Sequence, residues 1–141
     1  QSVKGVQIGD AYQQAASLGS SAQDEIIGLS NGHIERASNH AGGIEGGISN
    51  GSVLRVSAAL KPISTVPRAL RSVDLANGAA ATALHQRSDT CAVVPAAVIA
   101  QAEVAMVLAD ALLEKTGGDS LLEAKRNLAG YLEDVAERTN W

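Results

Sequence analysis

The sequence predicts an α+β fold in which short antiparallel strands come first and two long helices come last. Residues 52–60 alternate between two faces, as in a half-buried strand. Asn-Gly pairs at 31–32 and 77–78 are strong signals for hairpin turns. Long apolar stretches with helical spacing cover residues 95–115 and 120–137.

The first half of the chain predicts short elements separated by glycine. A strand over residues 3–8 ends at Gly9, and Asp10 is the expected N-cap of a helix over 11–18 that Gly19 closes. Strands over 24–29 and 33–36 flank the first Asn-Gly turn.

The second half predicts two more strands and then the helices. The strands cover residues 71–75 and 79–86, on either side of the second turn. Pro95 suits the first position of a helix that Gly117 and Gly118 stop. Asp119 is expected to cap the last helix, whose buried face contains Leu121, Leu122, Leu128 and Leu132.

Large aromatic side chains are nearly absent. The 141 residues include no Phe, one Trp and two Tyr, although 45% are hydrophobic. Aliphatic side chains and alanines each bury less area than an aromatic ring. We therefore expect part of the apolar surface to pack on another subunit or on the rest of a longer chain. The length fits one domain or part of a larger one, and a start at Gln1 rather than Met indicates a processed or cut piece.

Composition excludes several classes of protein. A net charge of −4 argues against general nucleic-acid binding, and one cysteine excludes an intrachain disulfide. The apolar stretch 95–113 carries Gln101, Glu103 and Asp110, so no membrane span is predicted, and no signal peptide is visible.

A basic, glycine-rich middle stands out in this acidic chain. Residues 46–73 contain no acid but include Arg55, Lys61, Arg68 and Arg71, and five glycines lie within residues 39–51. Glycine backbone, a lysine and the hydroxyls of Ser64 and Thr65 could together bind a phosphate. The alternative is a loop with solvated arginines, and composition alone does not decide between them.

Familiar motifs do not fit this region. The spacing is neither that of a P-loop nor that of the dinucleotide-binding Gly-x-Gly-x-x-Gly motif. His33, His40 and His85 are dispersed, so no zinc site is predicted. Cys91 precedes apolar residues, which is more typical of a core position than of a nucleophile.

The triplet Arg87-Ser88-Asp89 is the strongest candidate for chemistry. It lies between a strand end and a helix start, where loops often position functional groups. Arg87 could bind a phosphate or carboxylate, and Asp89 could act as an acid or base. The alternative is a surface ion pair, which spacing alone favours.

Taken in order, these segments resemble the C-terminal part of chorismate synthase, most closely its long actinobacterial form. The resemblance covers nearly the whole chain and rests on residues 7–10 (QIGD), 39–51 (NHAGGIEGGISNG), 61–67 (KPISTVP), 86–93 (QRSDTCAV) and 117–119 (GGD). It implies a β-α-β sandwich and a cytoplasmic homotetramer of the shikimate pathway. It also implies the loss of phosphate and a proton from 5-enolpyruvylshikimate 3-phosphate, giving chorismate, with reduced FMN as cofactor.

The resemblance also assigns residues. By position, FMN would be contacted by Gln1 and Ser2, in their own or a neighbouring subunit, and further by Gly46, Lys61, Pro62, Ile63, Ser64 and Thr65. Arg87 would face both substrate and flavin, and Asp89 would help to move the proton near flavin N5.

Two departures limit this transfer. The family's two catalytic histidines and its arginine cluster belong to the N-terminal part, so the chain alone is expected to bind FMN poorly and to be inactive. Gln101 also stands where the family often has Glu. The alternative function is a non-catalytic oligomerisation or anion-binding module with the same fold.

Overall fold

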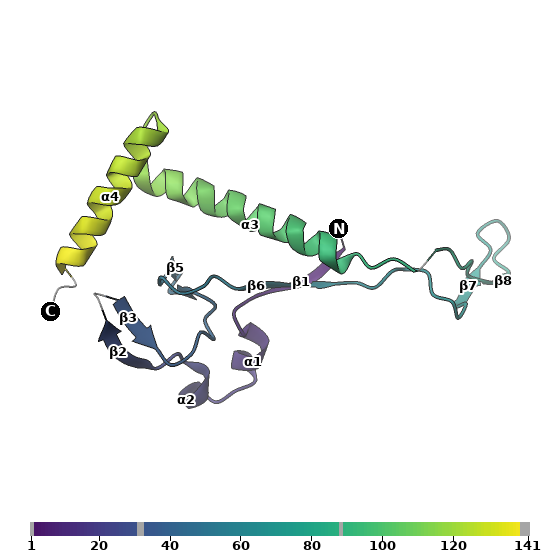
Figure 1. Cartoon of the computed structure of the whole chain (residues 1–141). Coiled ribbons are helices and arrows are strands. Elements are labelled where there is room, and N and C mark those ends of the chain that lie inside the picture. The colour runs from purple at the N-terminus through teal and green to yellow at the C-terminus, as the bar shows by residue number, and fades with distance from the viewer. Residues whose placement is uncertain (1, 31–32, 88, 139–141) are drawn as a thin grey trace.

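The computed structural model describes residues 2–30, 33–87 and 89–138. It confirms the α+β class, with antiparallel strand pairs followed by two long helices (Figure 1). The strands of the described residues form four separate two-stranded sheets: β1 with β6, β2 with β3, β4 with β5 and β7 with β8.

The central sheet joins two segments that are far apart in sequence. Strand β1 (Val3–Ile8) matches its predicted bounds, and it runs antiparallel to β6 (Val56–Leu60). Val3 pairs with Leu60 and Ile8 pairs with Val56. Strand β6 is shorter than the predicted 52–60 because Arg55 donates its backbone N–H to Gly42 instead of to a strand.

Two hairpins lie between these strands. The predicted pairing around the first Asn-Gly turn is confirmed by β2 (Ile26–Ser30) and β3 (His33–Arg36), although the turn residues lie outside the described residues. A second hairpin, β4 (Ile44–Glu45) and β5 (Ile48–Ser49), turns at Gly46 and Gly47, both with positive φ. Arg36 joins the hairpins through a bidentate ion pair with Glu45, at 2.8 and 2.6 Å.

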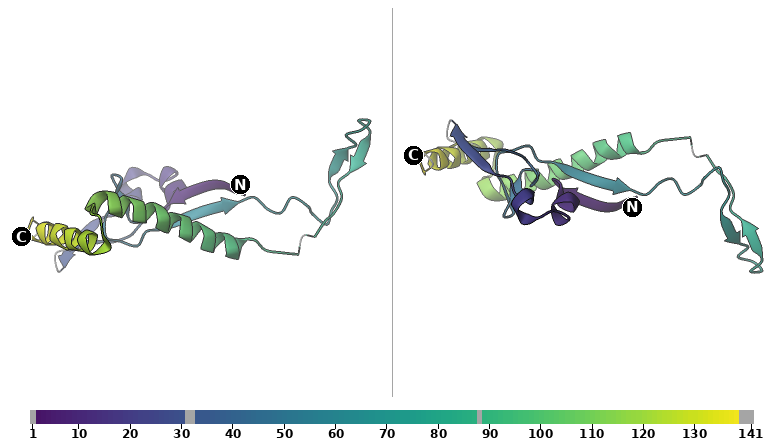
Figure 2. Two further views of the ribbon diagram at one scale, coloured as in Figure 1. Left: turned by 90° about the horizontal axis from the view of Figure 1, so that it is seen from above. Right: turned by 90° about the horizontal axis from the view of Figure 1, so that it is seen from below.

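The strands β7 (Arg71–Val73) and β8 (Ala80–Thr82) form an arm that projects from the rest of the chain (Figures 1 and 2). Both are shorter than predicted. At the turn, side chains take over backbone groups, and at its other end β8 stops at Thr82 instead of the predicted 86. The Asp74 carboxylate accepts a hydrogen bond from Ala76 N–H, and the Asn77 amide oxygen accepts one from Ala79 N–H, each at 2.8 Å.

The expected single helix over 11–18 is wrong. Helix α1 (Ala11–Ala15) ends early, and Leu18 takes an extended conformation before α2 (Gly19–Ala22) begins. Gly19 therefore starts a helix rather than closing one. The Asp10 side chain makes no cap hydrogen bond because it is engaged by residues distant in sequence.

The two long helices follow at their predicted places. Helix α3 (Val93–Thr116) begins two residues before Pro95 and stops at Gly117, whose φ of +59° suits glycine. Helix α4 (Leu121–Arg138) is capped by Ser120, whose hydroxyl accepts a hydrogen bond from Glu123 N–H at 3.2 Å. The prediction that Asp119 caps this helix is wrong, because the capping side chain is that of Ser120, one residue later.

The chain encloses almost no core, as its composition predicts. Its accessible surface is 11480 Å², whereas a compact protein of this mass exposes about 6,800 Å². Among described hydrophobic residues, only Ala22 and Ala124 are buried. The expected buried face of α4 is wrong for this chain, because Leu121, Leu122 and Leu132 are all more than half exposed. The expectation that part of this apolar surface packs on another subunit or on the rest of a longer chain stays a prediction.

Helix α3 shows this most clearly. It is long and apolar enough to cross a membrane, and none of its residues is buried in the chain. Gln101, Glu103 and Asp110 would nevertheless be costly within a bilayer. A helix that is apolar all round suits the interior of a larger fold, as the sequence predicts.

Candidate functional site

A hollow of about 510 Å³ opens where the chain leaves β6. One wall is the segment after the strand, and the other is the segment that leads into α3. The residues that line it are Leu60, Lys61, Pro62, Ile63, Thr65, Val66, Pro67, Thr90, Cys91, Ala92 and Val93. The structure thus brings together four of the sequence-predicted cofactor residues, Lys61, Pro62, Ile63 and Thr65, with residues that are 25 or more positions later.

Strand pairing brings a further candidate, Ser2, to the same place. The backbone N–H of Lys61 donates a hydrogen bond to the carbonyl oxygen of Ser2 at 2.9 Å. This bond continues the pairing of Val3 with Leu60, so the start of the chain lies at the mouth of the hollow. Gln1, the other candidate from this end, lies outside the described residues.

One hydrogen bond connects the hollow to the predicted catalytic triplet. The Thr65 hydroxyl donates to the backbone carbonyl of Gln86, with an O···O distance of 3.4 Å. Gln86 immediately precedes Arg87, whose Nε donates to the Asp89 carboxylate at 2.7 Å. Both side chains of this ion pair are about three-quarters exposed, so the pair is also a surface feature of the chain. Ser88 lies outside the described residues.

The hollow combines hydrogen-bond donors that suit an anion with an apolar surface that suits a ring. Lys61 has no carboxylate within ion-pair distance among the described residues, and Ser64 follows it three positions later. Ammonium and hydroxyl groups bind phosphate oxygens, whereas Pro62, Ile63 and Val66 offer apolar surface. The expectation that Cys91 is a core residue is wrong here, because the free thiol is exposed and lines the hollow.

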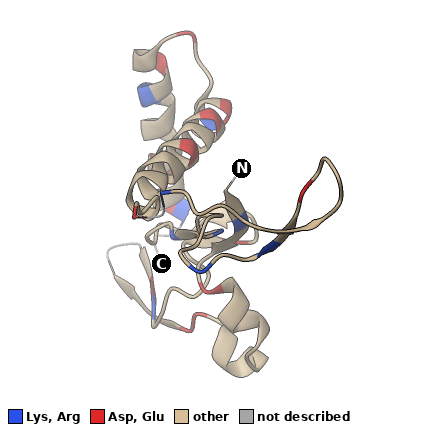
Figure 3. Cartoon of the chain, turned by 90° about the vertical axis from the view of Figure 1, so that its right-hand side faces the viewer, with Lys and Arg blue, Asp and Glu red and all other residues tan. Residues whose placement is uncertain are grey.

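The surrounding charge favours an anion at this place. Acidic side chains occur along α3 and α4, whereas residues 46–73, which include Lys61, contain none (Figure 3). Arg68 and Arg71 lie on the connection from the hollow to the arm.

In the glycine-rich segment, the N–H groups of Gly42 and Gly43 are not available for the expected anion cradle. Gly42 and Gly43 donate their N–H groups to the carbonyl and side-chain oxygens of Asn39, at 3.2 and 2.8 Å. Both glycines approach neighbouring backbone so closely that a Cβ would collide, with Gly9 and with Val53. Their function here is backbone packing.

Gly46 lies apart from Lys61 in this chain. Its hairpin is joined to the residues before β6, whereas Lys61 follows that strand. The five residues of β6, in extended conformation, place the residues before the strand roughly 17 Å from Lys61. The assignment of Gly46 to the cofactor remains a prediction.

A charged network at the start of α1 was missed by the sequence analysis. The Asp10 carboxylate accepts hydrogen bonds from Nδ1 of His40 at 2.8 Å and from the Arg55 guanidinium at 2.9 Å. The hydrogen bond from His40, together with that from Arg55, lowers the pKa of Asp10. Arg55 is therefore neutralised locally and does not contribute a free charge to the hollow. The partners of Asp10 lie 30 and 45 residues away in the sequence, so no local pattern could reveal them.

The Asp24 carboxylate holds the same loop, residues 38–41, in place. Asp24 accepts hydrogen bonds from the Ser38 hydroxyl and from the backbone N–H groups of His40 and Ala41, at 2.5, 2.7 and 2.9 Å. Burial alone would raise the pKa of Asp24, but the hydrogen bonds from Ser38, Ala41 and His40 outweigh it and lower that pKa. The loop is thus held by two ionised carboxylates.

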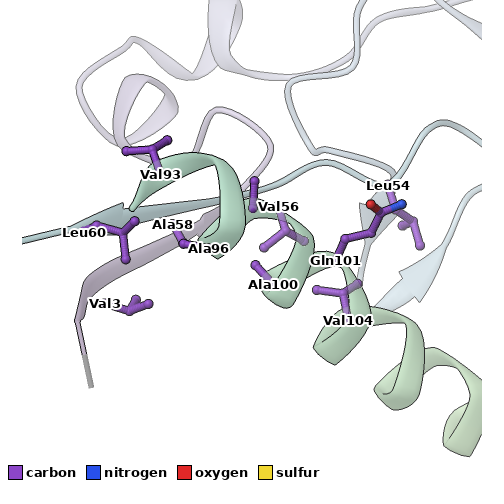
Figure 4. A pocket seen from close by; sticks show the side chains of 11 residues that line it. Val3, Leu54, Val56, Ala58, Leu60, Val93, Ala96, Ala100, Gln101 and Val104 are labelled. Carbon is purple, nitrogen blue, oxygen red and sulfur yellow. The ribbon is translucent and has the colours of Figure 1, made fainter. Parts of the chain in front are cut away.

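An apolar groove of about 320 Å³ separates β6 from α3 (Figure 4). Val56, Ala58 and Leu60 form one wall and alanines of α3 form the other. Gln101 is the polar side chain among the lining residues and points toward Leu54 (Figure 4). The groove joins the helix to the strand that positions Lys61. Among the residues that the structure describes, no cluster of His, Cys, Asp and Glu could hold a metal ion.

Comparison with known proteins agrees with these observations. The family model described as chorismate synthase matches residues 1–113. The chorismate synthases of Beutenbergia cavernae and Corynebacterium diphtheriae are 60% and 61% identical to the chain over 138 residues, 98% of its length. The chain spans about a third of their lengths, 35% and 34%. A solved structure, described as a crystal structure of chorismate synthase, is 39% identical in sequence, and it superposes with a TM-score of 0.73. The match covers 97% of this chain and 34% of the chain in that structure.

Proposed function

Because the chain belongs to the chorismate synthase family, we propose that it supplies the C-terminal part of an enzyme that forms chorismate. The substrate would be 5-enolpyruvylshikimate 3-phosphate, which loses phosphate and a proton from opposite faces. The observation that carries the proposal is that Lys61 and Thr65 line one hollow together with residues 90–93. Ser2 is hydrogen-bonded to Lys61, and Gln86, which precedes Arg87, is hydrogen-bonded to Thr65. Identity of about 60% to chorismate synthases favours this enzyme over a non-catalytic module.

The donor set fits FMN. The hollow of about 510 Å³ lies within the range typical of cofactor pockets. Lys61 and the hydroxyls of Ser64 and Thr65 would bind the phosphate, and Thr65 would exchange its 3.4 Å hydrogen bond to the Gln86 carbonyl for one to a phosphate oxygen. Pro62 and Ile63 would contact the ring. Ser2, Gln1 and Gly46 would complete the contacts, in the same or a neighbouring subunit. When bound, reduced FMN would lend electron density to the breaking C–O bond.

Arg87 and Asp89 would act together on the substrate side. In the chain the guanidinium and carboxylate hold each other at 2.7 Å. Arg87 would bind an anionic group of the substrate, because its remaining N–H groups can still donate. Asp89 would receive or relay the proton that the reaction releases, and the adjacent guanidinium would keep its carboxylate oriented.

The remaining parts of the site lie outside this chain. The family's catalytic histidines and substrate-binding arginines belong to the N-terminal part, which would pack on the exposed apolar surfaces of α3 and the central sheet. We propose a cytoplasmic homotetramer as the complete enzyme. Gln101, where the family often has Glu, would weaken one polar contact at the groove between β6 and α3.

The experiment is a chorismate-formation assay on the complete enzyme with Asp89→Ala and Lys61→Ala. General acid–base groups contribute roughly 10²–10⁴-fold to rate, so Asp89→Ala should lower kcat by that order while circular dichroism stays unchanged. Lys4→Ala, on β1 and not among the residues that line the hollow, is the matched control for Lys61→Ala. Wild-type rates for both site variants would remove the proposed roles.

A further inference from the structure

The turn at Gly46 and Gly47 has open space around it. Both residues have positive φ, at +58° and +79°, and apart from their chain neighbours no atom lies within 4 Å of where a Cβ on either would be. In the part of the chain that the structure describes, neither glycine donates its backbone N–H to another group. The turn therefore presents two backbone donors, and no side chain, to a molecule that approaches it.

The hairpin that carries this turn is too short to hold it in place alone. Strands β4 and β5 have two residues each, and an isolated two-stranded hairpin is at best marginally stable in water. The base of the hairpin is fixed, because Asn50 donates its N–H to the Gly43 carbonyl at 3.0 Å. Nearer the turn, Ile48 is 72% exposed, so apolar packing contributes little there.

A bidentate ion pair holds the turn end of the hairpin. Glu45, directly before Gly46, accepts hydrogen bonds from Nε and Nη2 of Arg36 at 2.8 and 2.6 Å. Arg36 is the last residue of β3, and its side chain is 11% exposed, whereas that of Glu45 is 37% exposed. Two hydrogen bonds from a planar guanidinium fix the orientation of the carboxylate as well as its distance, and partial burial limits screening by salt. The pair thus fixes the turn relative to β3.

We propose that Arg36 and Glu45 are positioning residues, which hold the turn at Gly46 and Gly47 in the conformation that contacts the flavin. The inference rests on the proposed function, and in particular on the contact between Gly46 and FMN in the same or a neighbouring subunit. Neither charged side chain needs to touch the cofactor. Because the ion pair orders the turn before FMN arrives, binding does not have to pay for that order.

A pair that served only the stability of the fold would behave differently. Its loss would lower the melting temperature and the fraction of folded enzyme, but each folded molecule would bind FMN with the wild-type dissociation constant. If the pair positions the turn, the dissociation constant itself rises, because FMN must then restrict the backbone of the turn as it binds. Affinity, rather than stability, therefore separates the two functions.

The first test is a fluorescence titration of FMN with the complete enzyme carrying Glu45→Gln. The Gln side chain has one acceptor oxygen and no charge, so the bidentate pair is lost at nearly constant shape. Ordering one residue of backbone on binding should weaken FMN affinity about tenfold, while KM for 5-enolpyruvylshikimate 3-phosphate at saturating reduced FMN stays unchanged. Wild-type FMN affinity in Glu45→Gln would overturn the proposal, whatever its melting temperature.

The matched control is Glu35→Gln, which makes the same chemical change on β3. Glu35 is exposed and directly precedes Arg36, and successive strand residues point to opposite faces. This variant should bind FMN like wild type. A loss of affinity equal to that of Glu45→Gln would show a general effect of charge and would overturn the specific function of the pair.

The second test asks whether the two residues act through each other. Arg36→Gln should weaken FMN binding as much as Glu45→Gln does, and the double variant should lose no more affinity than either single variant, because one interaction is removed in each case. Losses that add in the double variant would show that the residues act separately, and this result would contradict the positioning pair.

Salt dependence separates this inference from the proposed phosphate contact. Glu45→Gln should weaken FMN binding by the same factor at low and high salt, whereas Lys61→Ala should reduce the salt dependence. Wild-type behaviour of Lys61→Ala beside weakened binding in Glu45→Gln would contradict the phosphate contact and support the positioning pair. The reverse result would contradict the positioning pair alone, and a complete wild-type enzyme without affinity for FMN would contradict both.

Discussion

Lys61 donates its backbone N–H to the carbonyl of Ser2 at 2.9 Å, which holds the start of the chain against the end of β6. The bond leaves the Lys61 side chain at the mouth of the hollow, beside the segment that leads into α3. Two regions that are 59 residues apart thereby contribute to one candidate site. The predictions below follow from this arrangement and from the network that supports it.

The Thr65 hydroxyl should contribute to flavin affinity. Thr65→Val removes the hydroxyl at constant shape, and with it a hydrogen bond worth about 0.5–1.5 kcal/mol. We expect FMN to bind the complete enzyme roughly two- to tenfold more weakly, measured by quenching of flavin fluorescence. Thr90→Val, on the opposite wall of the same hollow, is the matched control. Equal affinities for wild type and Thr65→Val would show that the hydroxyl makes no contact.

Arg87 should act on substrate more than on folding. Its partner Asp89 is exposed, so Arg87→Lys removes bidentate binding with little effect on stability. We expect KM for 5-enolpyruvylshikimate 3-phosphate to rise about tenfold or more, while the melting temperature stays within about 2 °C of wild type. A fall in melting temperature with unchanged KM would show instead that the ion pair is structural.

The two carboxylates at the loop should make stability depend on acid pH. The pKa values of Asp10 and Asp24 are both lowered from 3.8 in the folded state. Their contribution is therefore present above pH 3.8 and is lost as pH falls through the folded-state values. Asp24→Asn should destabilise the protein at pH 6 and reduce the loss of stability below pH 4, measured by denaturant midpoints. Asp119→Asn, at the start of α4, should retain the wild-type pH dependence.

The contact between Gly9 and Gly42 should tolerate no side chain. A Cβ on Gly9 would lie 2.5 Å from Gly42 N and 2.7 Å from the Ala41 carbonyl carbon. Gly78 has a similar positive φ of +74° but open space around it. We expect Gly78→Ala to cost about 1–2 kcal/mol and Gly9→Ala clearly more, in urea unfolding of the complete enzyme. Equal costs would contradict the observed backbone contact.

Local sequence signals predicted the elements that depend on local rules. The β1 bounds, the hairpin of β2 and β3, and the glycine stop after α3 all follow from alternation, turn residues and positive φ. Asp10 shows where such rules fail. A helix-cap pattern predicted its function, but ion pairs with His40 and Arg55 prevailed, and their separations of 30 and 45 residues leave no local trace.

The site was predictable only in part for the same reason. Residues 61–67 and 86–93 were selected by resemblance. The structure places 61–63, 65–67 and 90–93 around one hollow, and the Thr65 to Gln86 bond joins the two segments. The participation of Cys91 was missed, because an isolated cysteine before apolar residues is typical of a core that this chain does not enclose. The expected burial of the α4 face likewise failed, because no described element covers Leu121, Leu122 and Leu132.

The central claim is that the Lys61 ammonium binds the phosphate of FMN, and fluorescence titration of the complete enzyme at two salt concentrations tests it most directly. A hydrogen bond to a charged group is worth about 1.5–3 kcal/mol, so Lys61→Ala should weaken FMN binding roughly ten- to a hundredfold and reduce its salt dependence. Lys4→Ala should bind like wild type. Equal FMN affinity and equal salt dependence for Lys61→Ala and wild type would contradict the account.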